Sequence, residues 1–256
     1  MTHAIETLLS TVKLPAGCRK RMDCPECGGR NTLSLTHDER GLVWHCFKAD
    51  CEVHGAKGTR LTTDSFSSLV AKEPVYQNPV TMERPPHWRD KLPFQMIAYL
   101  RENNCWHAYG NHKRRFAYDV KQNRAVFLIN RGSLVDAAGR ALDNRLPKWH
   151  RYGTSHEPFI MCPGVDVTGE YRTAVVVEDC ASACAVYSFY TGVAILGTSI
   201  LPAHIRALQR YKKVIVALDK DASEKGLDIA HKLSTVGIPS EVVFLEEDLK
   251  RNPKQI

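Results

Sequence analysis

The stretch Lys213-Val-Ile-Val-Ala-Leu-Asp219-Lys-Asp221 decides the fold class. Its apolar run over 214–218 is too continuous for a half-exposed strand and predicts a strand buried in a parallel sheet. Residues i and i+2 of a strand share a face, so the carboxylates of Asp219 and Asp221 would leave the sheet edge in one direction. Two such carboxylates repel each other, and a hard cation such as Mg²⁺ or Mn²⁺ relieves that repulsion. A solvated turn between strand and helix is the alternative.

A second apolar strand, over 174–177, also ends in acids, Glu178 and Asp179. The rest of this part of the chain alternates between predicted helices and strands: helices over 181–190, 202–211 and 224–236, and strands over 192–196 and 241–245. With right-handed crossovers, this alternation predicts an α/β fold whose mainly parallel sheet is flanked by helices. Both acidic strand ends would then meet at the edge where such sheets bind ligands. A third acidic group, Glu246-Glu247-Asp248, follows the last strand.

These acids, in this order, resemble the Toprim domain of DnaG-type and phage primases, topoisomerases and RecR proteins. The resemblance covers residues 172–250 and implies that Glu178, Asp219 and Asp221 bind catalytic Mg²⁺ or Mn²⁺. Asp248 matches the acid after the third strand, with its two glutamate neighbours as substitutes. Many members have Gly after the first acid and Asp four residues on. Here those positions hold Asp179 and Ser182, so the resemblance assigns Asp179 no role.

Length and composition indicate an ordinary water-soluble chain. Its 256 residues suffice for one to two domains, and 43% hydrophobic with 25% charged residues is typical of globular proteins. No apolar run approaches the ~20 residues of a membrane span, and the N-terminus lacks the pattern of a signal peptide. We therefore expect a cytoplasmic protein without membrane partners, in the host cytoplasm if a phage encodes it.

Four of the nine cysteines form a metal-binding pattern. They follow the spacing C-x2-C-x18-C-x4-C, and they are Cys24, Cys27, Cys46 and Cys51. Strands predicted over 32–36 and 41–46, with a turn between them, complete a zinc ribbon in which one structural Zn²⁺ replaces a hydrophobic core. His45 and His54 are near enough to be alternative ligands, and four free or buried thiols are the other interpretation. The five remaining cysteines show no pairing pattern: Cys18, Cys105, Cys162, Cys180 and Cys184.

The middle of the chain is basic. Residues 58–86 are polar and proline-containing and predict a flexible linker. Beyond it, strands are predicted over 116–118, 125–129 and 134–135, before a turn at 137–139. From Cys105 to Arg151 ten Lys or Arg oppose three acids, a net charge of +7 that equals the excess of the whole chain. This concentration indicates a surface for a polyanion, with a merely solvated basic surface as the alternative.

The basic region resembles the segment that precedes Toprim in bacterial and phage primases. The matching residues are Arg131-Gly-Ser-Leu-Val135, Gly139-Arg140 and Arg145-Leu-Pro-Lys148-Trp149-His-Arg151-Tyr152. The resemblance implies that Arg140 and Lys148 are catalytic residues that hold template or nucleotide phosphates. Arg131, Arg145 and Arg151 are further candidates for binding nucleic acid or NTPs. Trp149 and Tyr152 would either stack on a base or belong to the core.

The predicted organisation is a zinc-ribbon β domain (1–57), a linker (58–86), an α+β basic subdomain of an RNA-polymerase core (87–171) and a Toprim domain (172–256). This order resembles DnaG-type primases, most closely the primase part of phage primase–helicases. It implies a nucleotidyltransferase that makes short RNA primers from NTPs on single-stranded DNA for replication. The ribbon would read the template site, and two metal ions in Toprim would serve catalysis.

Other functions stay open at this point. The chain lacks a Gly-x4-Gly-Lys-Ser/Thr loop, so a replicative helicase would be a separate partner or the missing half of a longer protein. A non-catalytic RecR-like recombination mediator is the first alternative. It is disfavoured because the 120 residues from 52 to 171 separate the zinc motif from Toprim, whereas RecR-type proteins place the two side by side. A Toprim nuclease is the second alternative.

Overall fold

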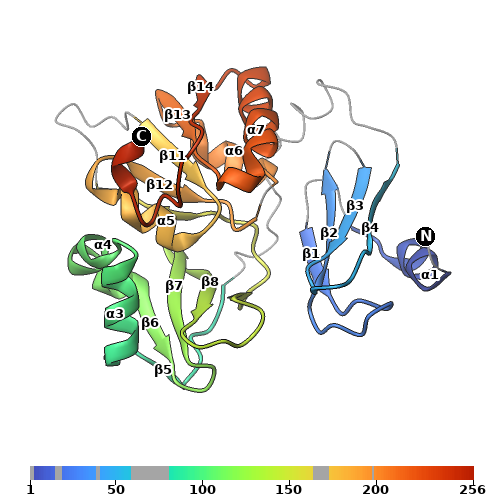
Figure 1. The fold of residues 1–256 in the computed structure, drawn as a ribbon, viewed down its shortest axis with the longest axis horizontal. Coiled ribbons are helices and arrows are strands. Elements are labelled where there is room, and N and C mark those ends of the chain that lie inside the picture. Colours follow the sequence, from blue (N-terminus) through green and yellow to red (C-terminus); the bar gives the residue numbers. More distant parts are fainter. Residues whose placement is uncertain (1–2, 15–18, 39–40, 59–80, 164–172, 198) are drawn as a thin grey trace. The chain divides into compact units, whose positions relative to one another are not determined.

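The protein, seen here in a computed structural model, divides into two compact units, Met1–Glu73 and Pro74–Ile256 (Figure 1). The structure describes residues 3–14, 19–38, 41–58, 81–163, 173–197 and 199–256. Most of the predicted linker and Cys18 therefore lie outside the described residues. No described helix is long and apolar enough to cross a membrane.

The first unit is a small antiparallel sheet with one helix. The helix is α1 (His3–Thr11), and the strands, in their spatial order, are β1 (Arg19–Met22), β2 (Leu33–Asp38), β3 (Gly41–Cys46) and β4 (His54–Lys57). The predicted hairpin of β2 and β3 is confirmed, and β1 and β4 extend it on either side. Leu33, Leu35 and Trp44 form the core, against which Ile5 and Leu9 of α1 pack. So few apolar side chains leave a core that needs further stabilisation.

The second unit begins with a five-stranded antiparallel sheet. Its strands, in their spatial order, are β5 (Trp88–Arg89), β6 (Phe116–Asp119), β7 (Arg124–Arg131), β8 (Ser133–Ala141) and β9 (Trp149–Arg151). Two helices, α3 (Phe94–Glu102) and α4 (Trp106–Asn111), lie between β5 and β6 in the chain, and a short 3-10 turn, Lys113–Arg115, leads from α4 into β6. The strands predicted in this region are confirmed.

The turn predicted at 137–139 is wrong, because β8 runs through these residues. Small side chains occur here to make room for neighbours. A Cβ on Gly139 would lie 2.7 Å from Cε2 of Tyr152 and 3.2 Å from Cδ of Arg124. The pattern Ala-Ala-Gly thus marks a close approach within a sheet, which sequence alone does not distinguish from a turn.

The second sheet of this unit is mainly parallel, as predicted. Its strands, in their spatial order, are β10 (Phe159–Met161), β12 (Thr191–Ala194), β11 (Thr173–Val177), β13 (Lys213–Val216) and β14 (Ser240–Val242). All neighbours pair parallel except β10, which runs antiparallel along the edge beside β12. The strand order reverses direction at β11, so its crossovers place helices on both faces. Figure 1 shows α6 (Pro202–Leu208) and α7 (Ser223–Thr235) on one face and α5 (Cys180–Ala185) on the other.

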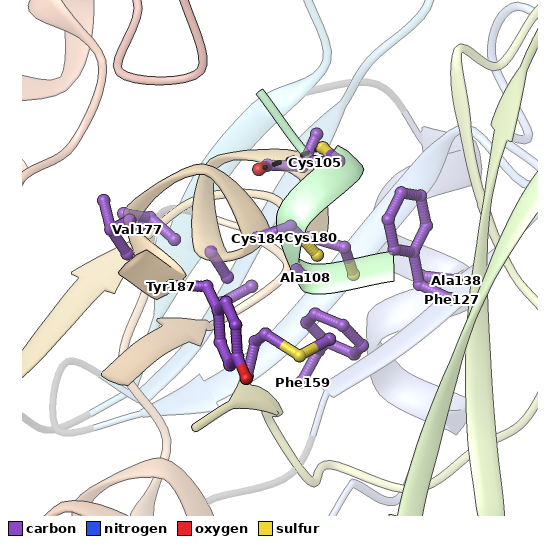
Figure 2. Close-up of a cluster of buried hydrophobic side chains, with 14 of the residues drawn as sticks. Cys105, Ala108, Phe127, Ala138, Phe159, Val177, Cys180, Cys184 and Tyr187 are labelled. Carbon is purple, nitrogen blue, oxygen red and sulfur yellow. Dashed lines mark hydrogen bonds between the residues drawn. The ribbon is translucent and has the colours of Figure 1, made fainter. Parts of the chain in front are cut away.

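The two sheets of the second unit share one hydrophobic core. Cys180 and Cys184 of α5 lie beside Cys105 at the start of α4, with Phe127 of β7 and Phe159 of β10 close by (Figure 2). The half-buried Arg115 joins the sheets as well. Its Nε donates to the carbonyl of Leu128 (2.9 Å), and its Nη2 donates to the carbonyl of Ile160 (3.1 Å). The basic region and the parallel sheet therefore form a single body.

Candidate functional site

The four predicted zinc ligands converge in the first unit. The sulfur atoms of Cys24, Cys27, Cys46 and Cys51 all lie within 4.8 Å of one another. The Cys24–Cys51 pair is 3.9 Å apart, and the Cys27–Cys46 pair is 3.7 Å apart. Tetrahedral Zn²⁺ with Zn–S bonds of ~2.3 Å requires S–S separations of about 3.8 Å. These thiols therefore fit one structural Zn²⁺.

Backbone geometry holds the cysteines in place. The turn after Cys24 is closed by a hydrogen bond from the N–H of Gly28 to the carbonyl of Cys24 (2.9 Å), and Gly28 has φ +63°. In the second turn the N–H of Cys51 donates to the carbonyl of Lys48 (3.2 Å). His45 and His54 are exposed and lie outside the sulfur cluster, so the ligand set predicted from sequence, four cysteines, is the set that the structure brings together.

The predicted acids lie at the carboxyl ends of adjacent strands. Glu178 follows β11 directly, and Asp219 follows β13 after two buried residues. The register of these strands pairs Val176 with Val216, so two residues further on Glu178 comes beside Leu218. Asp221 is exposed in the short helical turn Lys220–Ala222 that follows.

The electrostatics of this edge favour a cation. Burial first, and then the charges of Asp219 and Asp221, together raise the pKa of Glu178 to about 7. Burial also raises the pKa of Asp219, followed by the charge of Asp248. One oxygen of Glu178, Oε1, is buried and has no hydrogen-bond partner. A divalent ion would satisfy that oxygen and relieve the repulsion, so the carboxylates fit Mg²⁺ or Mn²⁺ in their chemistry. Among the described residues, however, only the cysteines have donor atoms that already converge within 4.8 Å.

Asp179, which the sequence left without a role, caps α5. Its Oδ1 accepts hydrogen bonds from the N–H groups of Ala181 (2.8 Å) and Ser182 (2.9 Å). Its Oδ2 accepts one from Nζ of Lys250 (3.2 Å), which also pairs with Oδ2 of Asp248. A cap at Asp179 could be read from the sequence, because Asp is a favoured residue before a helix. No sequence pattern pointed to Lys250.

The five predicted basic residues divide into two groups. Three of them have carboxylate partners: Arg131 with Glu157 (2.6 Å), Arg145 with Asp143 (2.9 Å) and Arg151 with Asp136 (2.7 Å). Arg140 and Lys148 have no carboxylate partner among the described residues. Arg140 lies over the ring of Trp149 at 5.9 Å, and Lys148 is exposed. These two cations are the ones available for phosphate oxygens.

A buried arginine that sequence analysis missed organises the backbone around Arg140 and Lys148. Arg124, at 2% exposure, donates from Nη1 to the carbonyls of Gly139 (3.2 Å) and Lys148 (3.3 Å) and from Nη2 to that of Pro147 (3.0 Å). It thereby joins β8 to the segment that carries Lys148. A charged residue at the start of an apolar strand usually indicates that this end of the strand is exposed to solvent. Nothing in the sequence therefore indicated the role of Arg124.

The predicted aromatic residues Trp149 and Tyr152 are partly buried and packed. The ring of Trp149 lies 5.7 Å from that of Phe127. The hydroxyl of Tyr152 donates to Oδ2 of the fully buried Asp119 (2.6 Å), and its ring meets Trp88 edge-on at 4.8 Å. Burial, followed by Asp119, raises the pKa of Tyr152. Both aromatics therefore contribute to packing.

One charge of the acidic edge and one charge of β8 act on the same side chain in the second unit. Tyr99 of α3 has a pKa raised well above its ordinary value, first by burial and then by the charge of Asp179, while Arg140 opposes this rise. Both charges thus act on one phenol. Since both sheets share a core, the positive and negative groups belong to one body.

Comparison with known proteins finds solved primase structures of low sequence identity. No family model and no curated protein matches the chain. It is similar to a DnaG primase catalytic domain bound to single-stranded DNA, with 22% identity over 63% of this chain and 68% of that one, at a TM-score of 0.45. It is similar to the E. coli primase catalytic core, with 21% identity over 61% of this chain and 67% of that one, at a TM-score of 0.46. It is also similar to the zinc-binding and RNA polymerase domains of the Aquifex aeolicus primase, with 16% identity over 96% of this chain and 77% of that one, at a TM-score of 0.42.

Proposed function

We propose that this protein is a DNA primase, which makes short RNA primers from NTPs on a single-stranded DNA template. The observation that carries this proposal is that a group of acids and a group of basic residues belong to the same compact unit. An edge of carboxylates, Glu178, Asp219 and Asp221, belongs to the same body as Arg140 and Lys148, two cations that have no carboxylate partner in the part of the chain that the structure describes. Template-directed phosphoryl transfer requires this combination of metal ligands and phosphate-binding cations.

Each group has a role in the proposed reaction. Glu178, Asp219 and Asp221, with Asp248 as a further ligand, would hold Mg²⁺ or Mn²⁺. When bound, the metal would activate the attacking 3′-hydroxyl and stabilise the pyrophosphate that leaves. Arg140 and Lys148 would bind phosphate oxygens of the template or the incoming nucleotide and offset their charge. Arg124 would keep the backbone of these two residues in place.

The zinc ribbon would select the template site. Phe47 beside its second cysteine pair is 57% exposed, and the guanidinium of Arg21 lies 4.8 Å from the centre of its ring. An exposed ring with a neighbouring cation suits the stacking of an unpaired base. A replicative helicase that delivers single-stranded DNA would be the expected protein partner.

The test is incubation with mixed-sequence single-stranded DNA, labelled NTPs and Mg²⁺ or Mn²⁺, with the products sized on a gel. Short, template-dependent RNA that disappears in the Asp219→Ala/Asp221→Ala double variant is the expected result. DNA that is bound but unaltered would indicate the mediator function instead. Shortened DNA would indicate a nuclease. RNA synthesis that survives in the double variant would refute the assignment of the metal edge.

A further inference from the structure

The acidic edge already holds a positive charge of its own, the ammonium group of Lys250. Its Nζ lies 3.2 Å from Oδ2 of Asp179 and in still closer contact with Oδ2 of Asp248. The side chain of Lys250 is 18% exposed and that of Asp179 12% exposed. The pair of Lys250 and Asp179 is therefore largely shielded from water, unlike most lysine–carboxylate pairs, while Asp248 is 35% exposed.

The structure holds Lys250 in this position from several sides. Leu249, its neighbour, is fully buried in the shared core. Nδ2 of Asn104 donates to the carbonyl of Lys250 (2.8 Å), and the N–H of Lys250 donates to Oδ1 of Asp248 (3.2 Å). A flexible surface lysine has no such constraints, so the ammonium group is positioned rather than incidental.

The five carboxylates of the edge consequently fall into two sets. Asp179 and Asp248 share the one positive charge of Lys250, and Asp179 also caps α5. Glu178, Asp219 and Asp221 have no basic partner within hydrogen-bonding distance in the described part of the chain, and Oε1 of Glu178 is buried without any partner. Among the described residues, only the second set has no ammonium or guanidinium group in direct contact.

We propose that Lys250 is a built-in cation that keeps Asp179 and Asp248 occupied, so that the free protein binds one divalent ion, through Glu178, Asp219 and Asp221. Asp248 becomes a ligand only when the ammonium group moves away. Lys250 is thus a positioning residue that sets how many metal ions the edge takes before substrate arrives. The inference rests on the proposed function for the identity of the metal edge, but its test counts ions and does not depend on RNA synthesis.

The experiment is a Mn²⁺ titration of the full chain with zinc in place, in which the electron paramagnetic resonance signal reports free Mn²⁺. The wild type should bind one ion, and Lys250→Met should bind two, because two carboxylates lose their cation. Lys250→Arg keeps the charge and should return to one ion. Lys213→Met is the matched control, since Lys213 pairs with Glu241 (2.7 Å) at the start of β13, away from the acidic edge, and should leave the count at one.

A second comparison does not depend on the folding of the Lys250 variants. Asp248→Asn should leave the Mn²⁺ affinity within about twofold of wild type, whereas Asp221→Asn should weaken it about tenfold or more, a change of ~1.4 kcal/mol. Two ions in the wild type, one ion in a folded Lys250→Met, or a tenfold loss in Asp248→Asn would each overturn the inference. A wild type that binds one ion but makes no RNA would support this inference and refute the primase.

Discussion

Arg151 was a candidate for binding nucleic acid, but its contacts predict that its removal acts on stability. Its Nε donates to Oδ2 of the fully buried Asp136 (2.7 Å), and its Nη2 donates to the carbonyl of Glu157 (3.0 Å). A hydrogen bond between charged groups contributes ~1.5–3 kcal/mol and a neutral one ~1 kcal/mol. The side chain is 23% exposed, so water partly replaces these bonds. We expect Arg151→Ala to lower the free energy of unfolding by about 3 kcal/mol, near the range for a broken buried ion pair.

The assay is urea unfolding followed by tryptophan fluorescence and circular dichroism. With a slope of ~2 kcal/mol per M, the midpoint should fall by about 1.5 M. Arg145→Ala is the control, because Arg145 and Asp143 are 40% and 37% exposed, and such pairs contribute below ~1 kcal/mol. The affinity for single-stranded DNA per folded molecule should stay near that of wild type in Arg151→Ala. A midpoint that shifts no more than in Arg145→Ala, together with a large loss of DNA affinity, would refute this reasoning.

Three further predictions follow from the site. Arg140→Ala and Lys148→Ala should each reduce the slope of log binding constant against log salt concentration for single-stranded DNA by about 0.7. Arg131→Ala should change this slope far less, because Arg131 is already paired with Glu157. Equal effects of the three changes would contradict the division of the basic residues. Removing zinc with a chelator should impair the choice of template site, measured by sequencing the products, more than the yield of dinucleotides. An equal loss of both would mean that the ribbon is merely structural. Asp179→Ala should cost ~1 kcal/mol for the lost helix cap, lowering Tm by about 2–4 °C in calorimetry, and an unchanged Tm would contradict the capping role.

The sequence predicted the features that depend on local patterns. The spacing in the sequence of Cys24, Cys27, Cys46 and Cys51 is typical of zinc ligands. It predicted that these four thiols lie together, and the structure brings them together. The apolar runs before Glu178 and Asp219 were long enough to mark buried parallel strands, because such strands have no polar face. Alternation of helices and strands then placed both acids at one edge. These inferences needed no knowledge of which distant residues meet.

The features that the sequence did not reveal all depend on distant contacts. Lys250 meets Asp179 across 71 positions of the chain, and Arg115 meets Ile160 across 45. Whether an arginine can bind a ligand or is already paired also depends on which residue lies opposite it in the fold. Arg140 and Arg151 look alike in the sequence, yet only Arg151 has a buried carboxylate opposite it. Gly139 was misread for the same reason, since its neighbour Arg124 comes from β7 and its neighbour Tyr152 directly follows β9.

The common core of the two sheets has a practical consequence for dissecting this protein. A cut at residue 171, where the sequence suggests a domain boundary, would remove β10 from the edge of the sheet that carries the acids. It would also expose the packed faces of Phe127, Phe159 and Cys180 to water. Fragments made that way should aggregate when expressed alone. We therefore expect a fragment that keeps the acidic edge in its folded form to need the second unit, Pro74–Ile256.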